Sequence, residues 1–185
     1  MLNLRTLGSL NLSTSDGREI TPVLSQPKRL ALLVYLAVAK PGEMVRRDTV
    51  LSLFWPERDD AHGRNALSQS LSFLRKNLPE KVLIGRGTEE VGLAPGLLRV
   101  DTVDLHTAIR EERWSDALGH YGGDFLHGFY IAEAWGFGEW VEEEREKWRE
   151  MAAGAAWSLA FVQLRGSSLV EAERTAQRAL SLVWS

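Results

Sequence analysis

The sequence predicts an α+β protein whose first half mixes strands with helices and whose second half is entirely helical. Apolar residues alternate with polar residues near both ends of the first half, as they do in half-buried strands. Between these runs, and throughout the second half, apolar residues recur every three or four positions, as they do in helices. The two patterns meet near residue 100. We therefore expect one domain over residues 1–100 and a second over residues 101–185.

Strands are expected at the N-terminus. Leucines alternate with polar residues there, at Leu2, Leu4, Leu10 and Leu12. Residues 15–18 (Ser-Asp-Gly-Arg) form a turn cluster, so the segment predicts a β-hairpin, with residues 20–24 as a candidate third strand. The absence of a basic segment followed by a long apolar run argues against a secretory signal, so we expect a cytoplasmic protein that does not enter the membrane.

Two helices should follow the strands. Ser25 is a candidate N-cap and Pro27 suits the first turn of a helix that the Lys-Pro-Gly sequence at residues 40–42 ends. A brief helix over residues 49–54 has Asp48 as its candidate N-cap. Trp55 should end it, because the residue before a proline is pushed out of the helical region, and we expect its ring to be buried.

A third helix, expected over residues 63–78, has the most distinctive surface. Its apolar stripe consists of Leu67, Leu71, Leu74 and Leu78. Its opposite side carries polar and basic residues and neither Asp nor Glu: Arg64, Asn65, Ser68, Gln69, Ser72, Arg75 and Lys76. A second hairpin follows within residues 81–100, with Arg86 at its tip.

These residue types suit recognition of duplex DNA. In the major groove Arg can read guanine, Asn or Gln can read adenine, and Ser can serve either. The charge of the chain is also uneven. Residues 1–100 carry 14 Lys and Arg against 10 Asp and Glu, a net of +4, whereas residues 101–185 carry 8 against 15, a net of −7. A basic half joined to an acidic half is typical of nucleic-acid binding, although the polar face alone would also suit an ordinary solvated helix.

Helices account for the second half. We expect short helices over residues 103–110 and 114–121, an irregular aromatic-rich segment over 125–138, and long helices over 139–164 and 169–183. The tryptophans should pack in the core, at Trp135, Trp140, Trp148 and Trp157. The last helix should bury one side, formed by Ala172, Ala176, Ala179, Leu180 and Val183. Small residues between two antiparallel helices are typical of helical repeats, which need about three units, so we expect this TPR-like domain to be incomplete.

Several blocks in order resemble the SARP-type transcriptional activators. In the first half these are Leu7-Gly-Ser-Leu10, Lys28-Arg-Leu-Ala-Leu-Leu33, Leu53-Phe-Trp-Pro56 and Asn65-Ala-Leu-Ser-Gln-Ser-Leu71. In the second half they are Tyr121-Gly-Gly-Asp-Phe-Leu126, Trp140-Val-Glu-Glu-Glu-Arg145 and the segment from Ala172 to Leu180. The resemblance implies an N-terminal winged helix-turn-helix of the OmpR/PhoB kind, followed by an all-α bacterial transcriptional activator domain.

The resemblance also implies roles for residues of this chain. The helix from Arg64 to Lys76 would be the recognition helix, and Arg46, Arg47, Arg86 and Thr88 would contact phosphates through the wing and its surroundings. The loop that faces RNA polymerase would include Pro56, Glu57, Arg58, Asp59 and Asp60. Members of the family bind direct repeats at promoters as homodimers and recruit RNA polymerase, so double-stranded DNA and RNA polymerase are the expected partners.

Other classes of function are less well supported. Without cysteine the chain can form neither disulfides nor thiolate metal sites. It has no Gly-Lys-Ser/Thr phosphate loop and no nucleophile elbow, so we expect no enzyme and no cofactor. His120, Asp124 and His127 fit no known metal-ligand spacing, so no metal is expected either. The alternative to DNA binding is a TPR-like scaffold for protein interactions, favoured by the acidic, tryptophan-rich second half.

Overall fold

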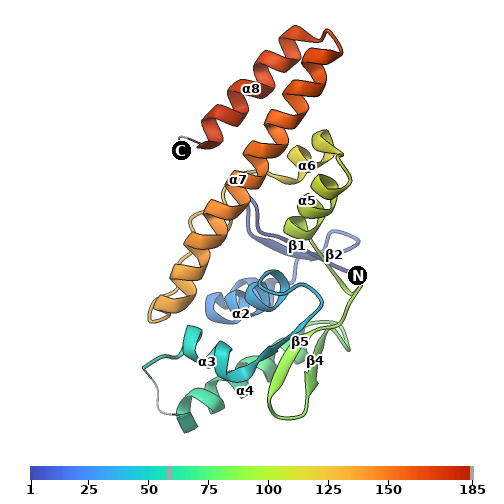
Figure 1. Cartoon of the computed structure of the whole chain (residues 1–185). Coiled ribbons are helices and arrows are strands. Elements are labelled where there is room, and N and C mark those ends of the chain that lie inside the picture. Colours follow the sequence, from blue (N-terminus) through green and yellow to red (C-terminus); the bar gives the residue numbers. More distant parts are fainter. Residues whose placement is uncertain (58–59, 184–185) are drawn as a thin grey trace. The chain divides into compact units, whose positions relative to one another are not determined.

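The computed structural model describes residues 1–57 and 60–183, and it is an α+β protein, as expected (Figure 1). Small mixed sheets and helices form the N-terminal part, and two long helices pack together in the C-terminal part. The contacts divide the chain into two compact units. The first comprises Met1–Thr6, Leu10–Val100 and Gly128–Trp140, and the second comprises Leu7–Ser9, Asp101–His127 and Val141–Ser185. Two segments therefore fall on the other side of the domain boundary expected after residue 100.

In the first unit, a three-stranded sheet has the order β2-β1-β6. Strand β1 (Leu2–Arg5) pairs antiparallel with β2 (Asn11–Thr14) and parallel with β6 (Leu98–Val100). The leucines that alternate along β1 and β2 are buried, which is why these strands form one covered face. The expected hairpin exists, but its turn precedes Asn11. Residues 15–18 instead make a tight turn after β2, in which the amide of Gly17 donates to the carbonyl of Thr14 at 2.9 Å.

The candidate third strand over residues 20–24 is wrong, because this segment forms the short helix α1 (Thr21–Leu24) with Pro22 in its first turn. A proline suits the start of a helix but lacks the N–H that a sheet needs. Helix α2 (Pro27–Val38) follows, and every residue from Leu30 to Val38 is buried. Its N-cap is Gln26 rather than the expected Ser25, whose hydroxyl donates to the carbonyl of Pro22 at 3.1 Å.

A second three-stranded sheet of the first unit has the order β3-β5-β4. Strand β3 (Met44–Arg46) leads into helix α3 (Arg47–Phe54), and helix α4 (Asp60–Asn77) leads into the hairpin of β4 (Leu83–Arg86) and β5 (Glu90–Leu93). Asp48 is not the N-cap of α3, since the helix begins two residues earlier than expected and its N-cap is Arg46. The cause is the amide of Arg47, which donates to the carbonyl of Glu89 at 2.8 Å and ties this helix start to the hairpin.

Aromatic rings complete the core of the first unit. Phe137, 2% exposed, lies with its ring centroid 4.9 Å from that of Phe54. The ring of Trp140 lies 4.9 Å from that of Tyr35. Phe137 and Trp140 both belong to the start of helix α7 (Trp135–Arg165), which begins before residue 139, where the sequence predicts it. The segment expected to be irregular therefore supplies core to the first unit.

The second unit consists of helices α5 (Asp101–Arg110), α6 (Trp114–His120), the remainder of α7 and α8 (Leu169–Val183). The last turn of α6 and the chain between α6 and α7 are held by arginines of the long helices. Arg145 donates to the carbonyls of Phe125 and Leu126 at 2.9 and 2.8 Å, and Arg178 donates to those of Leu118 and Tyr121. Gly8 is needed at one close approach, because a Cβ there would lie 2.6 Å from backbone atoms of Gly122.

Helix α8 runs back beside α7 (Figure 1). The turn between them satisfies the helix end: the amide of Ser168 donates to the carbonyl of Gln163, and that of Ser167, at a φ of 63°, donates to Leu164. Ala172 and Ala179 are buried as expected, but Leu180 and Val183 are 46% and 58% exposed. Among the tryptophans Trp148 is buried, whereas Trp135 and Trp157 are 69% and 45% exposed, which contradicts the prediction that they pack in the core. None of the described helices has an apolar stretch that could cross a bilayer.

We expect Phe137→Ala to lower the free energy of unfolding by about 3–5 kcal/mol, because it leaves a cavity in the aromatic core of the first unit. Urea unfolding followed by circular dichroism measures the change. Tyr130→Ala is the matched control, since Tyr130 lies in the same segment but is 72% exposed, and it should change stability by less than about 0.5 kcal/mol. Equal losses in the two variants would contradict the packing of this segment.

A pH dependence is expected in the second unit. Burial, together with the Asp124 carboxylate 3.2 Å from its hydroxyl, raises the pKa of Tyr121 to about 12, above an unfolded value of about 10. The neutral phenol is therefore favoured by folding, and its contribution is complete below about pH 10 and is lost as the pH rises towards 12. Urea midpoints between pH 9 and 12 should fall less steeply in Tyr121→Phe than in the parent chain. Parallel profiles would contradict this assignment.

Candidate nucleic-acid interface

The orientation of helix α4 is fixed by its buried side. Leu67, Leu71 and Leu74 are at most 1% exposed. The hydroxyl of Ser70, on the same side, donates to the carbonyl of Ala66 at 2.9 Å and so needs no other partner. Rotating the helix would bring these leucines into water at a cost of about 1.5–3 kcal/mol each. The polar side must therefore face outward.

Every residue that the sequence places on the polar face of α4 is exposed: Arg64, Asn65, Ser68, Gln69, Ser72, Arg75 and Lys76. Within the described part of the chain, the side chains of Asn65, Gln69 and Ser72 make no hydrogen bond. Their donors and acceptors are thus open to an external partner. Arg75 and Lys76 occupy the last turn, where their charge also complements the helix dipole.

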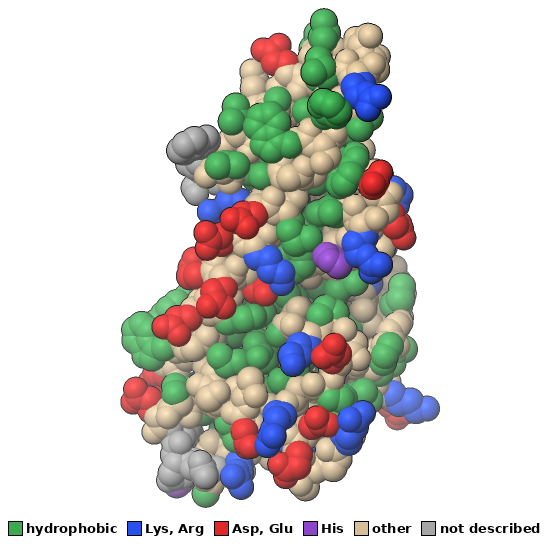
Figure 2. All heavy atoms as spheres, in the orientation of Figure 1, with side chains coloured by type: hydrophobic (Ala, Val, Ile, Leu, Met, Phe, Trp, Pro, Cys, Tyr) green, Lys and Arg blue, Asp and Glu red, His purple; other side chains and the backbone are tan. Residues whose placement is uncertain are grey.

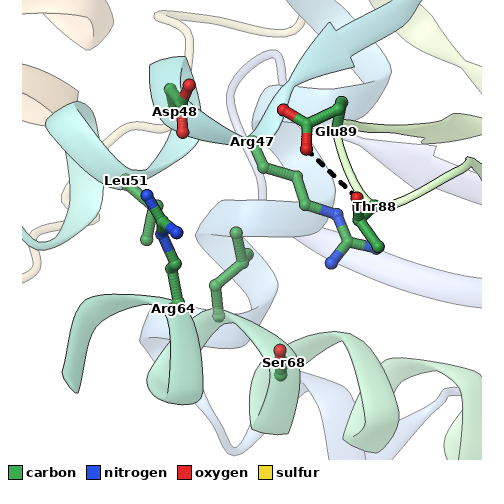
Figure 3. Close-up of a pocket in the computed structure, with 8 residues that line it drawn as sticks. Arg47, Asp48, Leu51, Arg64, Ser68, Thr88 and Glu89 are labelled. Carbon is green, nitrogen blue, oxygen red and sulfur yellow. Dashed lines mark hydrogen bonds between the residues drawn. The ribbon is translucent and has the colours of Figure 1, made fainter. Parts of the chain in front are cut away.

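A hollow of about 320 Å³ lies between α3, α4 and the turn of the β4–β5 hairpin. Its lining consists of Arg47, Asp48, Leu51, Arg64, Leu67, Ser68, Thr88 and Glu89. Figure 3 shows Arg47 reaching from the start of α3 towards Thr88 and Glu89, while Arg64 and Ser68 project from α4. The hydroxyl of Thr88 donates to the carboxylate of Glu89 at 3.1 Å. Two of the expected phosphate contacts, Arg47 and Thr88, therefore share one hollow with two residues of the expected recognition face.

Guanidinium groups converge beside this hollow, at Gly85. A Cβ placed on Gly85 would lie 4.0 Å from Nη2 of Arg47 and 4.0 Å from Nη2 of Arg75, so these two nitrogens are at most twice that distance apart. The Nε of Arg47 is buried and has no hydrogen-bond partner in the described structure. Two cations held near each other, one with an unsatisfied donor, favour an anion such as a phosphate. This convergence could not be predicted from the sequence, because it depends on how α3, α4 and β4 pack.

The remaining two expected phosphate contacts are exposed but already paired. Arg46 lies 3.5 Å from Asp48, and Arg86 lies 3.4 Å from Glu90. Exposed pairs of this kind contribute about 0–1 kcal/mol, so either arginine can exchange its carboxylate for another anion at little cost. Sequence reasoning missed both carboxylates. The carboxylate of Glu90 could have been predicted, since a hairpin with its turn at residues 87–89 places Arg86 opposite Glu90.

The loop expected to face RNA polymerase is described only in part. Pro56 and Glu57 are exposed, Arg58 and Asp59 lie outside the described residues, and nothing is described of the side chain of Asp60. Trp55, at the start of this loop, is 7% exposed and packs 5.8 Å from the ring of Phe54, as expected for a buried anchor. Its ring thus fixes the point at which the loop leaves α3.

No cluster of three His, Asp or Glu side chains in the described ranges is arranged to hold a metal ion. A scan against models of known protein families finds no match to the chain, and a search of curated proteins finds no match either. The candidate interface is therefore described from the residues of this chain alone. It consists of the polar face of α4, the hollow beside it and the β4–β5 hairpin.

The unsatisfied donor of Arg47 predicts a stability effect. Arg47→Met should leave the free energy of unfolding unchanged or raise it by up to about 1–3 kcal/mol, because the variant keeps the apolar stem and removes a buried N–H that has no partner. Urea unfolding provides the measurement. Arg46→Met, at a neighbouring exposed position, should change stability by less than about 0.5 kcal/mol. A loss of more than about 1 kcal/mol in Arg47→Met would show that this guanidinium is a structural group instead.

Proposed function

We propose that this chain is a sequence-specific activator of transcription that binds double-stranded DNA, of the SARP type that its sequence resembles. The observation that supports the proposal most directly is the outward face of α4 over residues 64–76, which has no carboxylate and whose amide and hydroxyl side chains are open to a partner. Under this proposal α3 and α4 form a helix-turn-helix of the OmpR/PhoB kind, α4 is its recognition helix, and the β4–β5 hairpin is its wing. The second unit is a TPR-like activator domain.

The dimensions of α4 suit the major groove. Asn65, Gln69, Ser72 and Lys76 follow one another at helical spacing over 11 residues, which corresponds to about 16 Å along the axis. That is close to the length of five base-pair steps at about 3.4 Å each. An amide side chain such as that of Asn65 or Gln69 can donate to and accept from adenine in a bidentate manner, and Arg64 can donate two hydrogen bonds to the O6 and N7 acceptors of guanine.

Phosphates would be contacted by cations around α3, the end of α4 and the β4–β5 hairpin. Arg47 and Arg75 converge at Gly85, and Arg46 and Arg86 are exposed nearby with only weak ion pairs to exchange. Thr88 adds a hydroxyl at the tip of the hairpin. Contacts of this kind fix register without reading sequence, whereas the face of α4 would supply the base contacts.

The further parts of the proposal follow from the resemblance. The chain would bind direct repeats at promoters as a homodimer and recruit RNA polymerase through the loop of residues 56–60. It would act in the cytoplasm, without enzymatic activity. A variant with Glu57→Ala should then bind DNA normally but activate transcription less in a reconstituted assay.

One observation favours the alternative, a protein-interaction scaffold that does not bind DNA. Large hydrophobic side chains of α7 and α8 are exposed, among them Phe161 and Leu169 at 60% and 64%. Loss of partner binding in variants of this surface, together with a failure of the whole chain to bind any duplex, would favour the scaffold over the activator.

The direct test is selection of duplexes from a random pool by the purified chain, followed by affinity measurements at several salt concentrations. The proposal predicts enrichment of a repeated motif. The logarithm of the affinity should fall with the logarithm of the salt concentration by about 0.9 per neutralised phosphate. A flat salt response with no enriched motif would contradict the proposal.

Variants of the two kinds of contact should behave differently. Asn65→Ala or Gln69→Ala should weaken binding to the selected site by about 1–3 kcal/mol and relax the preference at one base pair. Arg86→Ala should weaken binding to all duplexes alike and lower the salt slope by about one. Competition assays with single-base variants of the site distinguish these outcomes. A uniform loss in Gln69→Ala and Asn65→Ala would show that neither residue reads a base.

A further inference from the structure

Gly85 lies inside strand β4 at a position whose backbone conformation does not require glycine. Its φ is outside the left-handed region, and the nearest atom to an added Cβ, the carbonyl oxygen of Glu90, would lie at an ordinary 3.5 Å. A glycine inside a strand lowers the stability of the strand and often marks a place where a ligand approaches the backbone closely. The missing side chain leaves an exposed space beside the strand.

Two arginines approach this space from different helices. Nη2 of Arg47, at the start of α3, and Nη2 of Arg75, in the last turn of α4, each lie 4.0 Å from the position of that Cβ. The two nitrogens are therefore at most twice that distance from each other. Like charges at such a separation repel, and an anion placed between them turns this repulsion into attraction.

Within the described residues, no carboxylate neutralises this pair, since neither guanidinium forms an ion pair or a hydrogen bond there. The acidic side chains nearby have other partners. Asp48 lies 3.5 Å from Arg46, and Glu90 lies 3.4 Å from Arg86. Glu89 accepts the hydroxyl of the preceding threonine. Figure 2 shows basic side chains interspersed with acidic ones on the visible face of the molecule, which is the arrangement that these two arginines lack.

The edge of the Arg47 guanidinium that approaches Gly85 is the one suited to an oxyanion. Nε and Nη2 lie on the same edge of the group, and together they can donate two parallel hydrogen bonds to one carboxylate or phosphate. Nη2 is the atom that approaches Gly85, and Nε is buried without a partner in the described structure. Both donors of this edge are thus available to one ligand.

We infer that the protein, free of DNA, binds a small phosphate-type dianion at this site, between Arg47 and Arg75 and against the backbone of Gly85. Arg47 donates from Nε and Nη2, and Arg75 donates from the facing guanidinium. Charge-assisted hydrogen bonds of about 2.7–2.9 Å on each side, together with the width of the anion, span a separation of this size. A dianion neutralises both arginines, whereas a phosphodiester carries one charge.

This inference goes beyond the proposed function, because the anion binds without DNA. The same two arginines are phosphate contacts in the proposed function. Competition between free phosphate and duplex DNA is therefore a consequence that rests on the proposed function. The binding of the anion is tested in the absence of DNA, so its failure would leave the test of DNA binding unaffected.

Urea unfolding of the full chain tests the inference, with orthophosphate as the probe and sodium chloride at equal ionic strength as the reference. The urea midpoint should rise with phosphate concentration as a one-site binding curve requires, beyond any effect of chloride. Dimethyl phosphate, a monoanionic diester like the DNA backbone, should raise it less. An equal rise with both phosphates would assign the site to the DNA backbone and overturn the inference of a dianion site.

Arginine variants locate the effect. Arg47→Met and Arg75→Met should each raise the dissociation constant for phosphate by roughly tenfold or more, because each removes charge-assisted hydrogen bonds to the anion. Arg18→Met is the matched control, since it removes the same charge from an exposed position in the turn after β2. It should change this constant by less than about twofold. Equal effects of the three variants would overturn the inference.

A second pair of variants supplies the anion from the chain itself. Gly85→Asp places a carboxylate between the two arginines, and Gly85→Asn places an uncharged group of the same size there. In phosphate-free buffer Gly85→Asp should have the higher urea midpoint, and it should no longer respond to phosphate. Circular dichroism without urea shows whether both variants are folded. A phosphate response that persists undiminished in Gly85→Asp, or the absence of any phosphate-specific response in the parent chain, would contradict the site.

Discussion

The buried leucines of α4 are the constraint on which the rest of the interface depends. Leu67, Leu71 and Leu74 lie almost completely within the first unit, so the rotation of the helix about its axis is set by hydrophobic burial. The rotation of an α-helix sets the direction of every side chain on it, so the exposed positions follow from the buried ones. The face that Asn65, Gln69 and Ser72 share is outward for that reason, and a role in recognition requires no further rearrangement of the helix.

The charges around α4 fall into two classes with different consequences. Arg46 and Arg86 are exposed and paired with carboxylates, so an external anion would have to displace Asp48 and Glu90. Arg47 is half-buried, close to Arg75, and keeps a donor without a partner. A protein stabilised only for its own folding would have a neutral residue there. An unsatisfied buried donor is instead understandable where an anion completes its hydrogen bonds, and it links stability to function at this position.

Much of the first unit could be predicted from local pattern, because helix spacing and turn residues are written in neighbouring positions. The outward face of α4 is the clearest case. The pairing of β6 with β1 could not be predicted in this way, since the two strands lie far apart in the sequence, with Leu2 paired to Leu98. The same holds for Phe137, whose ring fills the first unit from a distant segment. For α8, the apolar spacing correctly indicated a helix, but it could not show that Leu180 and Val183 would be left exposed, because an apolar stripe does not specify whether its cover lies within the chain.

The proposed function depends on the binding of duplex DNA by the outward face of α4 and the adjacent hairpin. Titration of the isotopically labelled chain with a selected duplex, followed by amide and side-chain chemical shifts, tests it most directly. We expect the largest changes at the side-chain amides of Asn65 and Gln69 and at the backbone of residues 85–89, with little change in α8. Saturable binding whose shifts lie in α7 and α8 and spare α4 would contradict it.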